Sequence, residues 1–171
     1  QPKGGKVLVV STDPGVSSVD ARVGGFADAA NTNKKFNYIG VQYSHNDPAT
    51  AQRIITAALA KNKDIVAVFA TNLFSAQGVA TGIKQAGKAG KISVVGFDAG
   101  SDQVKALKAG VVQALIAQQP ATIGSKGIEA AVAAIAGKAV SPKKVQTGFT
   151  ILTKKNIDTA AGTKAQYRDA C

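Results

Sequence analysis

The sequence predicts an α/β protein built on an open parallel sheet with helices on both faces, and three observations support this fold class. Short apolar runs alternate with amphipathic segments along most of the chain. Most of these runs are almost continuously apolar, as in parallel strands that are covered on both faces. The 171 residues are 45% hydrophobic but only 5% aromatic, with no Trp and no Met, so small side chains should pack the helices against the sheet of one domain.

Six segments have the composition of β-strands. The runs KVLVV, IVAVFA and ISVVGF are almost continuously apolar, whereas FNYIGVQY and TGFTILT contain more polar residues. The predicted strands span residues 6–10, 36–43, 65–70, 92–97, about 113–117 and 147–153. Each of the first five is followed by a helical pattern, so right-handed crossovers should build a Rossmann-like parallel sheet.

Five segments have the period of helices, and several carry end signals. Asp47 followed by Pro48 is a favourable helix start, and Ser101 is a second N-cap candidate. The predicted helices span residues 18–30, 48–61, 73–87, 101–109 and 121–136. Glycines stand at or just after three of these ends, at Gly87, Gly110 and Gly137.

Two segments depart from the alternation. Residues 137–146 form a polar connector that is longer than the others, so the helix before it should lie apart from the main body. Residues 154–171 have little periodicity, and we expect this tail to wrap the surface or to be mobile. The sequence therefore predicts one domain over residues 1–153 and a tail over 154–171.

The charge and the start of the chain limit the classes of function that the sequence supports. The formal net charge is +11, but only three of the 21 basic residues are arginines, and the lysines are scattered singly or in pairs. Nucleic-acid readers usually concentrate these residues and interleave aromatics, so we expect a solvated basic surface and no nucleic-acid partner, while attraction to an acidic surface or membrane stays open. No apolar run approaches the ~20 residues of a membrane span. The chain begins at Gln1 without Met, and we interpret it as a processed or excised piece.

Polar side chains follow the predicted parallel strands at their carboxyl ends. Ligands of open parallel sheets bind at this edge, where loops and helix N-termini meet. The residues concerned are Asp13, His45, Asn46, Asn72, Asp98 and Gln118. We expect them to form one polar rim that hydrogen-bonds a neutral ligand rich in hydroxyl groups.

Each of these residues also has a simpler interpretation. Asp98 could only start the turn before the next helix, and Asn72 could be an ordinary helix cap. His45 is the only histidine, and a single loop histidine is more often solvated than catalytic. Asp20 and Arg22 could form a surface pair, although Arg22 is also placed to reach the rim.

Catalytic and cofactor motifs are absent from the sequence. There is no G-x-S-x-G, no H-x-x-x-H and no C-x-x-C, and the glycines of the segment GVSSVDARVGG do not match a phosphate-binding loop. The single cysteine, Cys171, is the last residue, which excludes an internal disulfide and argues against a catalytic thiol. We expect no metal, no cofactor and no enzymatic activity. The alternative is a small Rossmann-like enzyme with Asp98 or His45 as its base.

Four segments resemble periplasmic sugar-binding proteins of the ribose-binding type, which deliver substrates to ABC importers. They are DARVGGF, DIVAVFATN, SVVGFDAG and ALIAQQPATIGSKGIEAA, and the likeness extends in order from KVLVV to FTILT. The resemblance implies the C-terminal lobe of a type I periplasmic binding protein, in which two lobes clamp a sugar. It further implies a missing N-terminal lobe, a transporter permease as partner, and a periplasmic or otherwise extracytoplasmic location, secreted or membrane-anchored.

The resemblance also assigns site residues. Asn72, Asp98 and Gln118 match positions that hydrogen-bond the sugar in the family, and Arg22 matches an arginine near the ligand. Ribose-specific members place an arginine where this chain has Asp20 and an aromatic residue where it has Asn46, which favours another sugar or a polyol. A related alternative is the effector-binding core of a lactose-repressor-type regulator.

The predicted helix 121–136 carries an apolar stripe formed by Ile123, Ile128, Val132 and Ile135. In the family, the segment that corresponds to residues 119–145 packs on the other lobe. We expect weak sugar binding by this chain alone. Our hypothesis for the stripe is a homodimer, or a helix exchanged between two copies.

Overall fold

The computed structural model describes residues 3–168 and confirms the α/β fold class, while Gln1 and Cys171 lie outside the described residues. Strands and helices alternate as the sequence predicts, and most boundaries agree within two or three residues. The strands are β1 (Gly5–Ser11), β2 (Phe36–Tyr43), β3 (Ile65–Ala70), β4 (Ser93–Phe97), β5 (Ala114–Gln118) and β6 (Phe149–Leu152). The helices are α1 (Ser17–Thr32), α2 (Pro48–Lys61), α3 (Leu73–Gln85), α4 (Ser101–Lys108), α5 (Pro120–Ile135) and α6 (Ala160–Lys164).

The strands form one sheet in the order β2-β1-β3-β4-β5-β6. β1 to β5 are parallel, whereas β6 runs antiparallel to β5. The prediction of a purely parallel sheet was therefore wrong for the last strand. Helix α5 leads the chain away from the sheet at the end where β5 finishes and does not carry it back along the sheet. The chain therefore re-enters the sheet at that same end, and β6 must run in the opposite direction to β5.

Helices cover both faces of the sheet. On one face, Ile55 of α2, Ile83 of α3 and Leu107 of α4 are fully buried in the main core cluster. On the other face, Phe26 of α1 stacks on Phe69 of β3 with ring centroids 5.4 Å apart. The small side chains expected from the composition dominate this core, in which alanines and valines outnumber the larger aliphatic residues.

The helix starts follow the sequence signals with one exception. The Asp47 carboxylate accepts hydrogen bonds from the backbone N–H groups of Ala49 and Thr50, which confirms it as the N-cap of α2. Ser101 is not the N-cap of α4, because it is already helical and Gly100 occupies the extended capping position. The predicted C-terminal glycines all have positive φ angles just beyond their helices, at 64° for Gly87, 79° for Gly110 and 67° for Gly137.

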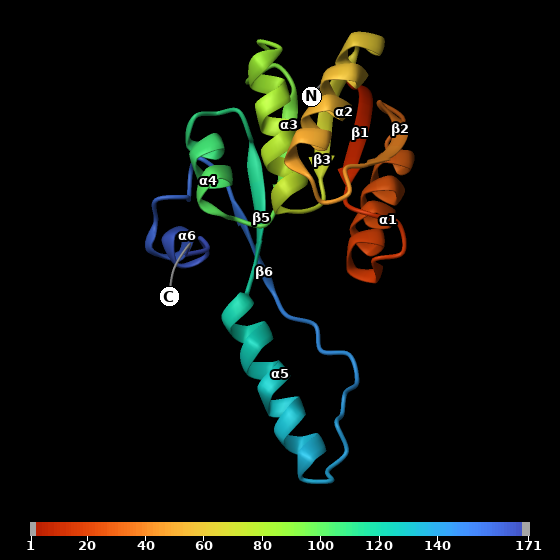
Figure 1. The fold of residues 1–171 in the computed structure, drawn as a ribbon. Helices are drawn as coiled ribbons and strands as arrows, with labels where there is room; N and C mark the ends of the chain where they lie inside the picture. The colour runs from red at the N-terminus through yellow and green to blue at the C-terminus, as the bar shows by residue number, and fades with distance from the viewer. Residues whose placement is uncertain (1–2, 169–171) are drawn as a thin grey trace.

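Helix α5 extends away from the body of the domain, as the long connector predicted (Figure 1). It leaves the carboxyl edge of the parallel strands and contains no buried residue. Its apolar stripe lies in solvent, with exposed fractions of 44% for Ile123, 67% for Ile128, 60% for Val132 and 87% for Ile135. No helix among residues 3–168 is long and apolar enough to cross a membrane.

The described part of the tail packs on the domain. Ile157 is 1% exposed and belongs to the main core cluster, and Tyr167 packs against the same cluster. The Thr159 hydroxyl accepts a hydrogen bond from the backbone N–H of Gly162 and so caps the short helix α6. A single buried isoleucine carries no periodicity, which is why the sequence pattern did not predict this anchor.

We predict that Gly78→Ala lowers the free energy of unfolding by about 1–3 kcal/mol, because α2 and α3 approach closely there. A Cβ at Gly78 would lie 2.5 Å from the Ala51 Cβ and even closer to the Pro48 carbonyl oxygen. Gly24→Ala in α1 is the matched control, since its Cβ would meet open space, and we expect it to stabilise by about 1 kcal/mol. Urea unfolding measures both, and equal midpoints for the two variants would contradict the packing argument.

Candidate functional site

The six predicted rim residues lie at the carboxyl edge of the sheet and join in three hydrogen-bonded pairs. The pairs are Asp13 with His45 (Oδ1 to Nδ1, 2.5 Å), Asn72 with Asn46 (Nδ2 to Oδ1, 2.6 Å) and Gln118 with Asp98 (Nε2 to Oδ1, 2.7 Å). Each pair joins residues that follow different strands. The rim is therefore a row of hydrogen-bond donors and acceptors that are paired with one another.

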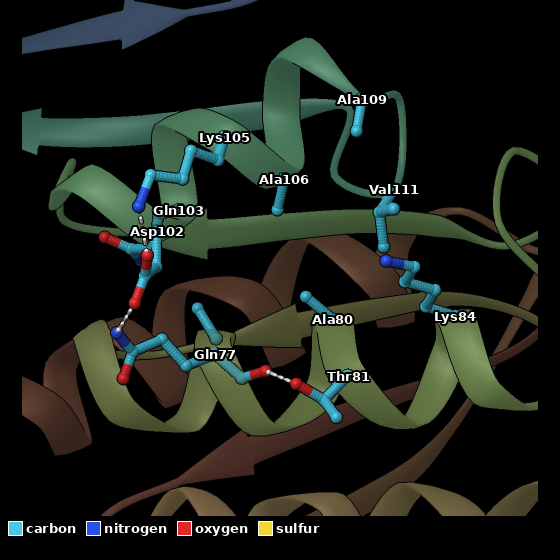
Figure 2. A pocket seen from close by; sticks show the side chains of 11 residues that line it. Gln77, Ala80, Thr81, Lys84, Asp102, Gln103, Lys105, Ala106, Ala109 and Val111 are labelled. Carbon is cyan, nitrogen blue, oxygen red and sulfur yellow. Dashed lines mark hydrogen bonds and ion pairs between the residues drawn. The ribbon is translucent and has the colours of Figure 1, made fainter.

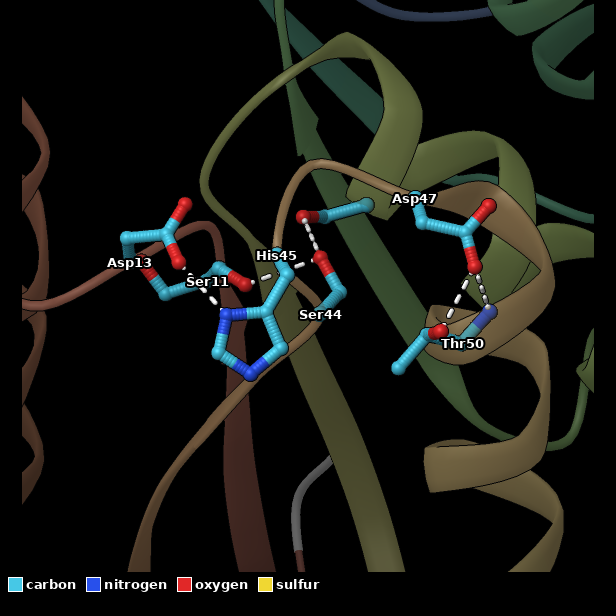
Figure 3. A network of polar contacts seen from close by, with 7 residues as sticks. Ser11, Asp13, Ser44, His45, Asp47 and Thr50 are labelled. Carbon is cyan, nitrogen blue, oxygen red and sulfur yellow. Dashed lines mark hydrogen bonds and ion pairs between the residues drawn. The ribbon is translucent and has the colours of Figure 1, made fainter.

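The first pair joins the loop after β1 to the turn after β2 (Figure 3). The side chain of His45 is 70% exposed and that of Asp13 is 46% exposed. His45 and Asn46 both have positive φ angles, 52° and 56°, in the turn after β2. This backbone region is uncommon for residues other than glycine, although Asn and His tolerate it better than most. The turn directs His45 towards Asp13 and Asn46 towards Asn72.

A layer of buried hydroxyl groups lies beneath the exposed pair and connects the strand ends. Ser11 and Thr71 hydrogen-bond through their side-chain oxygens at 2.9 Å. The Ser44 hydroxyl donates to the Ser11 carbonyl at 2.9 Å and pairs with the Ser75 hydroxyl at 3.0 Å. All four residues are fully buried, so the layer holds the ends of β1, β2 and β3 in fixed positions. A serine or threonine at the end of each of these strands is the sequence signal for this layer, and it did not enter the predicted rim.

Asn72 is both a helix cap and a rim residue. Its Oδ1 accepts from the backbone N–H of Ser75 at 3.0 Å, which confirms the capping interpretation for α3. Its Nδ2 points to the other side and donates to Asn46. The cap therefore orients the amide group and leaves its N–H groups on the rim.

Asp98 accepts three hydrogen bonds from three different segments. The backbone N–H of Leu73 donates to its Oδ2 at 3.0 Å, and the Gln118 amide and the Tyr167 hydroxyl donate to its Oδ1 at 2.7 and 3.1 Å. Its side chain therefore does more than start the turn before α4, whose N-cap is Gly100. A carboxylate offers about four acceptor positions, so Asp98 can accept a further hydrogen bond through Oδ2.

Tyr167 is a site residue that was not predicted from the sequence. Its hydroxyl donates to Asp98 and accepts from the backbone N–H of Gln118 at 2.9 Å. Burial, followed by the neighbouring Asp98 carboxylate, raises the pKa of Tyr167 to about 12, while the Gln118 N–H acts in the opposite direction. A single tyrosine in an aperiodic tail has no sequence signal for this position.

Arg22 of α1 reaches the centre of the rim. Its Nη1 donates to the Thr71 carbonyl at 2.9 Å, and its guanidinium lies 3.6 Å from the centroid of the Phe97 ring. Burial lowers the pKa of Arg22, while the charge of Asp98 acts in the opposite direction. Arg22 therefore joins the ends of β3 and β4 instead of forming the surface pair with Asp20.

Asp20 lies beside the rim and stabilises the loop after β1. Its Oδ2 accepts from the backbone N–H of Gly15 at 3.0 Å, which ties this loop to the start of α1. In the same loop, Thr12 carries the one buried side-chain oxygen among residues 3–168 that has no hydrogen-bond partner. Buried polar groups without a partner are rare in native proteins, so Thr12 is an exception to the satisfied hydroxyl layer beside it.

Two hollows lie near the ends of the sheet strands and their helices, and only one of them is lined by rim residues. A groove of about 460 Å³ separates α3 from α4 and contains none of them (Figure 2). Across it, the Gln77 amide donates to the Asp102 carboxylate at 3.5 Å. A second hollow of about 450 Å³ lies at the end of β5, where Gln118 and Tyr167 line it. Residues 3–168 hold no cluster of acidic, histidine or cysteine side chains suited to a metal ion.

Comparisons with known proteins find curated relatives of this chain. The ribose import binding protein of Salmonella typhimurium is 36% identical over 149 residues, which cover 87% of this chain and 48% of that protein. The D-allose-binding periplasmic protein of Escherichia coli K12 is 33% identical over 127 residues, which cover 74% and 41%. The chain thus spans about half the length of these curated relatives.

Solved structures show the same likeness. An ABC transporter solute-binding protein from Agrobacterium vitis, bound with α-D-tagatopyranose, is 38% identical, with a TM-score of 0.94 over 98% of this chain and 56% of that chain. A second protein from this organism, bound with D-fucose, is 36% identical, with a TM-score of 0.90 over 96% and 57%. The sequence pattern of one family, described as a periplasmic binding protein domain, matches residues 1–139. The chain therefore belongs to the periplasmic binding protein family, whose sugar-binding members it resembles in sequence and in fold.

Proposed function

We propose that this chain is the sugar-binding second lobe of the solute-binding component of an ABC importer, and that it binds a sugar or polyol without catalysing a reaction. The observation that carries the proposal is the rim of three hydrogen-bonded pairs at the carboxyl edge of the sheet. Its groups are carboxylates, amides, an imidazole and the nearby guanidinium of Arg22. Such a mixture suits a ligand whose hydroxyl groups both donate and accept.

The pairing explains how the rim stays satisfied before a ligand arrives. A sugar hydroxyl can donate to Asp98 while another accepts from the Gln118 amide, so the ligand takes the place of each partner in turn. Exchange of one hydrogen bond for another contributes only about 0.5–1.5 kcal/mol, but bonds to the charged carboxylate are roughly twice as strong. We therefore expect Asp98 to contribute most to the affinity.

A second lobe would complete the site. The rim and α5 lie at the same edge of the sheet, so a lobe seated on the apolar stripe of α5 would face the rim and enclose the ligand. We propose that residues 119–145 make this contact, that residues 1–153 form the lobe itself, and that a transporter permease recognises the closed form. The periplasm, where the D-allose-binding relative is located, is the proposed location.

The ligand is proposed to differ from ribose. Asn46 and Asp20 occupy positions where ribose-specific proteins carry an aromatic residue and an arginine, and both contribute polar groups at or beside the rim. The two solved relatives described above were bound with D-tagatose and D-fucose, and a third, from Agrobacterium radiobacter, with D-arabinose. A hexose or polyol would use the additional polar groups, so these compounds belong in the first panel.

We predict that at least one sugar or polyol binds this chain weakly, and that Asp98→Asn reduces the affinity by about tenfold or more because a charged acceptor is lost. Asparagine tolerates the φ of 78° at this position, so the variant should keep the fold. Two-dimensional NMR titration with D-ribose, D-allose, D-tagatose, D-fucose, D-arabinose and sorbitol measures millimolar affinities.

Asp102→Asn is the matched control. It removes the same charge from the exposed first turn of α4, close to Asp98 in the sequence, and should leave the affinity unchanged. Equal losses in both variants would indicate a general effect of charge. Stabilisation of the chain by a nucleotide or a divalent cation, with no response to any sugar, would contradict the proposal and favour the alternative of a small enzyme.

We further predict that the chain alone forms a dimer through α5, because the stripe exposes large apolar side chains to water. Ile128→Lys combined with Val132→Lys should shift the protein to a monomer in analytical ultracentrifugation. Lys126→Ala, on the same helix but outside the stripe, should not change the sedimentation. A wild-type chain that stays monomeric at high micromolar concentration would refute the dimer.

A further inference from the structure

The hydroxyl of Tyr167 joins three parts of the chain that are distant in the sequence. It donates to Oδ1 of Asp98 at 3.1 Å and accepts from the backbone N–H of Gln118 at 2.9 Å. Gln118 is the last residue of β5, and α5 begins two residues later. The tail residue therefore contacts both the principal carboxylate of the rim and the point where the chain leaves the domain.

The tail holds Tyr167 in this position through several contacts. The backbone N–H of Tyr167 donates to the Ala99 carbonyl at 2.9 Å, next to Asp98 in the sequence. The Gln166 amide donates to the Ile157 carbonyl at 2.8 Å, and Ile157 itself is buried in the core. The backbone of Tyr167 is thus bound to the domain and its tail neighbour to the buried Ile157, while the hydroxyl has both a donor and an acceptor.

We propose that Tyr167 is a positioning residue, which holds the Asp98 carboxylate and the junction between β5 and α5 in one arrangement for ligand binding. The inference deepens the proposed function and rests on it. It makes the C-terminal tail part of the sugar site, although the tail contributes no residue to the rim itself.

The hydrogen bonds at Asp98 show why such a residue is needed. Gln118 and Tyr167 both donate to Oδ1. When the Gln118 amide turns to a ligand hydroxyl, Asp98 loses one of these donors, and Tyr167 remains to fix the carboxylate together with the Leu73 N–H on Oδ2. Tyr167 therefore permits Gln118 to exchange partners without releasing Asp98.

A purely structural role for Tyr167 would have different consequences. In that case the ring would anchor the tail, and loss of the hydroxyl would change neither the ligand affinity nor the properties of Asp98. Tyr167→Phe distinguishes the two roles because it keeps the ring and removes only the hydroxyl. Tyr38→Phe is the matched control, because Tyr38 lies on β2, the outermost strand on the side of the sheet away from β5 and β6.

The first experiment needs no ligand. Burial, and then the Asp98 charge, raises the pKa of Tyr167 to about 12, so Asp98→Asn should shift the titration of this phenol to lower pH, whereas Asp102→Asn should not. Tyrosine ring NMR signals followed against pH measure the shift, with Tyr167→Phe used for assignment. An unchanged titration in Asp98→Asn would overturn the contact.

The raised pKa also makes stability depend on pH. The folded protein keeps the phenol protonated above pH 10, the ordinary pKa, whereas the unfolded chain loses this proton there. Tyr167 therefore makes its full contribution to stability below pH 10, and this contribution is lost as the pH rises towards 12. The difference in unfolding free energy between wild type and Tyr167→Phe should shrink over this window. A constant difference from about pH 8 to pH 12 would count against the proposal.

The decisive experiment is the NMR titration of Tyr167→Phe with the sugar that binds wild type best. We expect the affinity to fall roughly three- to tenfold, as for one lost hydrogen bond, and to stay unchanged in Tyr38→Phe. Wild-type affinity in Tyr167→Phe would overturn the positioning role and leave the proposed sugar binding intact. If no sugar binds wild type, sugar binding and the positioning role fail together, and the phenol titration then reports on the contact alone.

Discussion

The Asp98 carboxylate connects more separate segments than any other group on the rim. Its three hydrogen bonds come from the start of α3, the end of β5 and the C-terminal tail, and its charge acts on the guanidinium of Arg22 from α1. A carboxylate at the end of a buried strand would be costly without these donors. Because each donor sits on a different element, the position of the carboxylate depends on the whole domain being folded.

The same principle applies along the rest of the rim. Each rim residue hydrogen-bonds with a residue from another strand end, and the buried hydroxyl layer fixes those ends from below. Left-handed backbone at His45, Asn46 and Asp98 places side chains where a regular turn would not direct them. The domain itself therefore holds the rim in one arrangement, and such preorganisation lowers the entropic cost of binding a ligand.

The polar rim and the apolar stripe of α5 are separate surfaces of the domain. The rim offers hydrogen-bonding groups to a ligand, whereas α5 offers an apolar stripe that the domain itself does not cover. Both lie at the carboxyl edge of the sheet, so a partner bound on α5 would lie near the rim. The domain thus leaves both a polar and an apolar surface uncovered on the same side.

Local patterns in the sequence determined most of the fold and the membership of the rim. Apolar runs, caps and strand-end polar residues are short-range features, so the elements and Asp13, His45, Asn46, Asn72, Asp98 and Gln118 could be predicted from them. The tertiary structure alone decided the antiparallel direction of β6, the pairing of rim residues and the place of Tyr167. These depend on contacts between residues 20 to 69 positions apart, which no periodic pattern encodes.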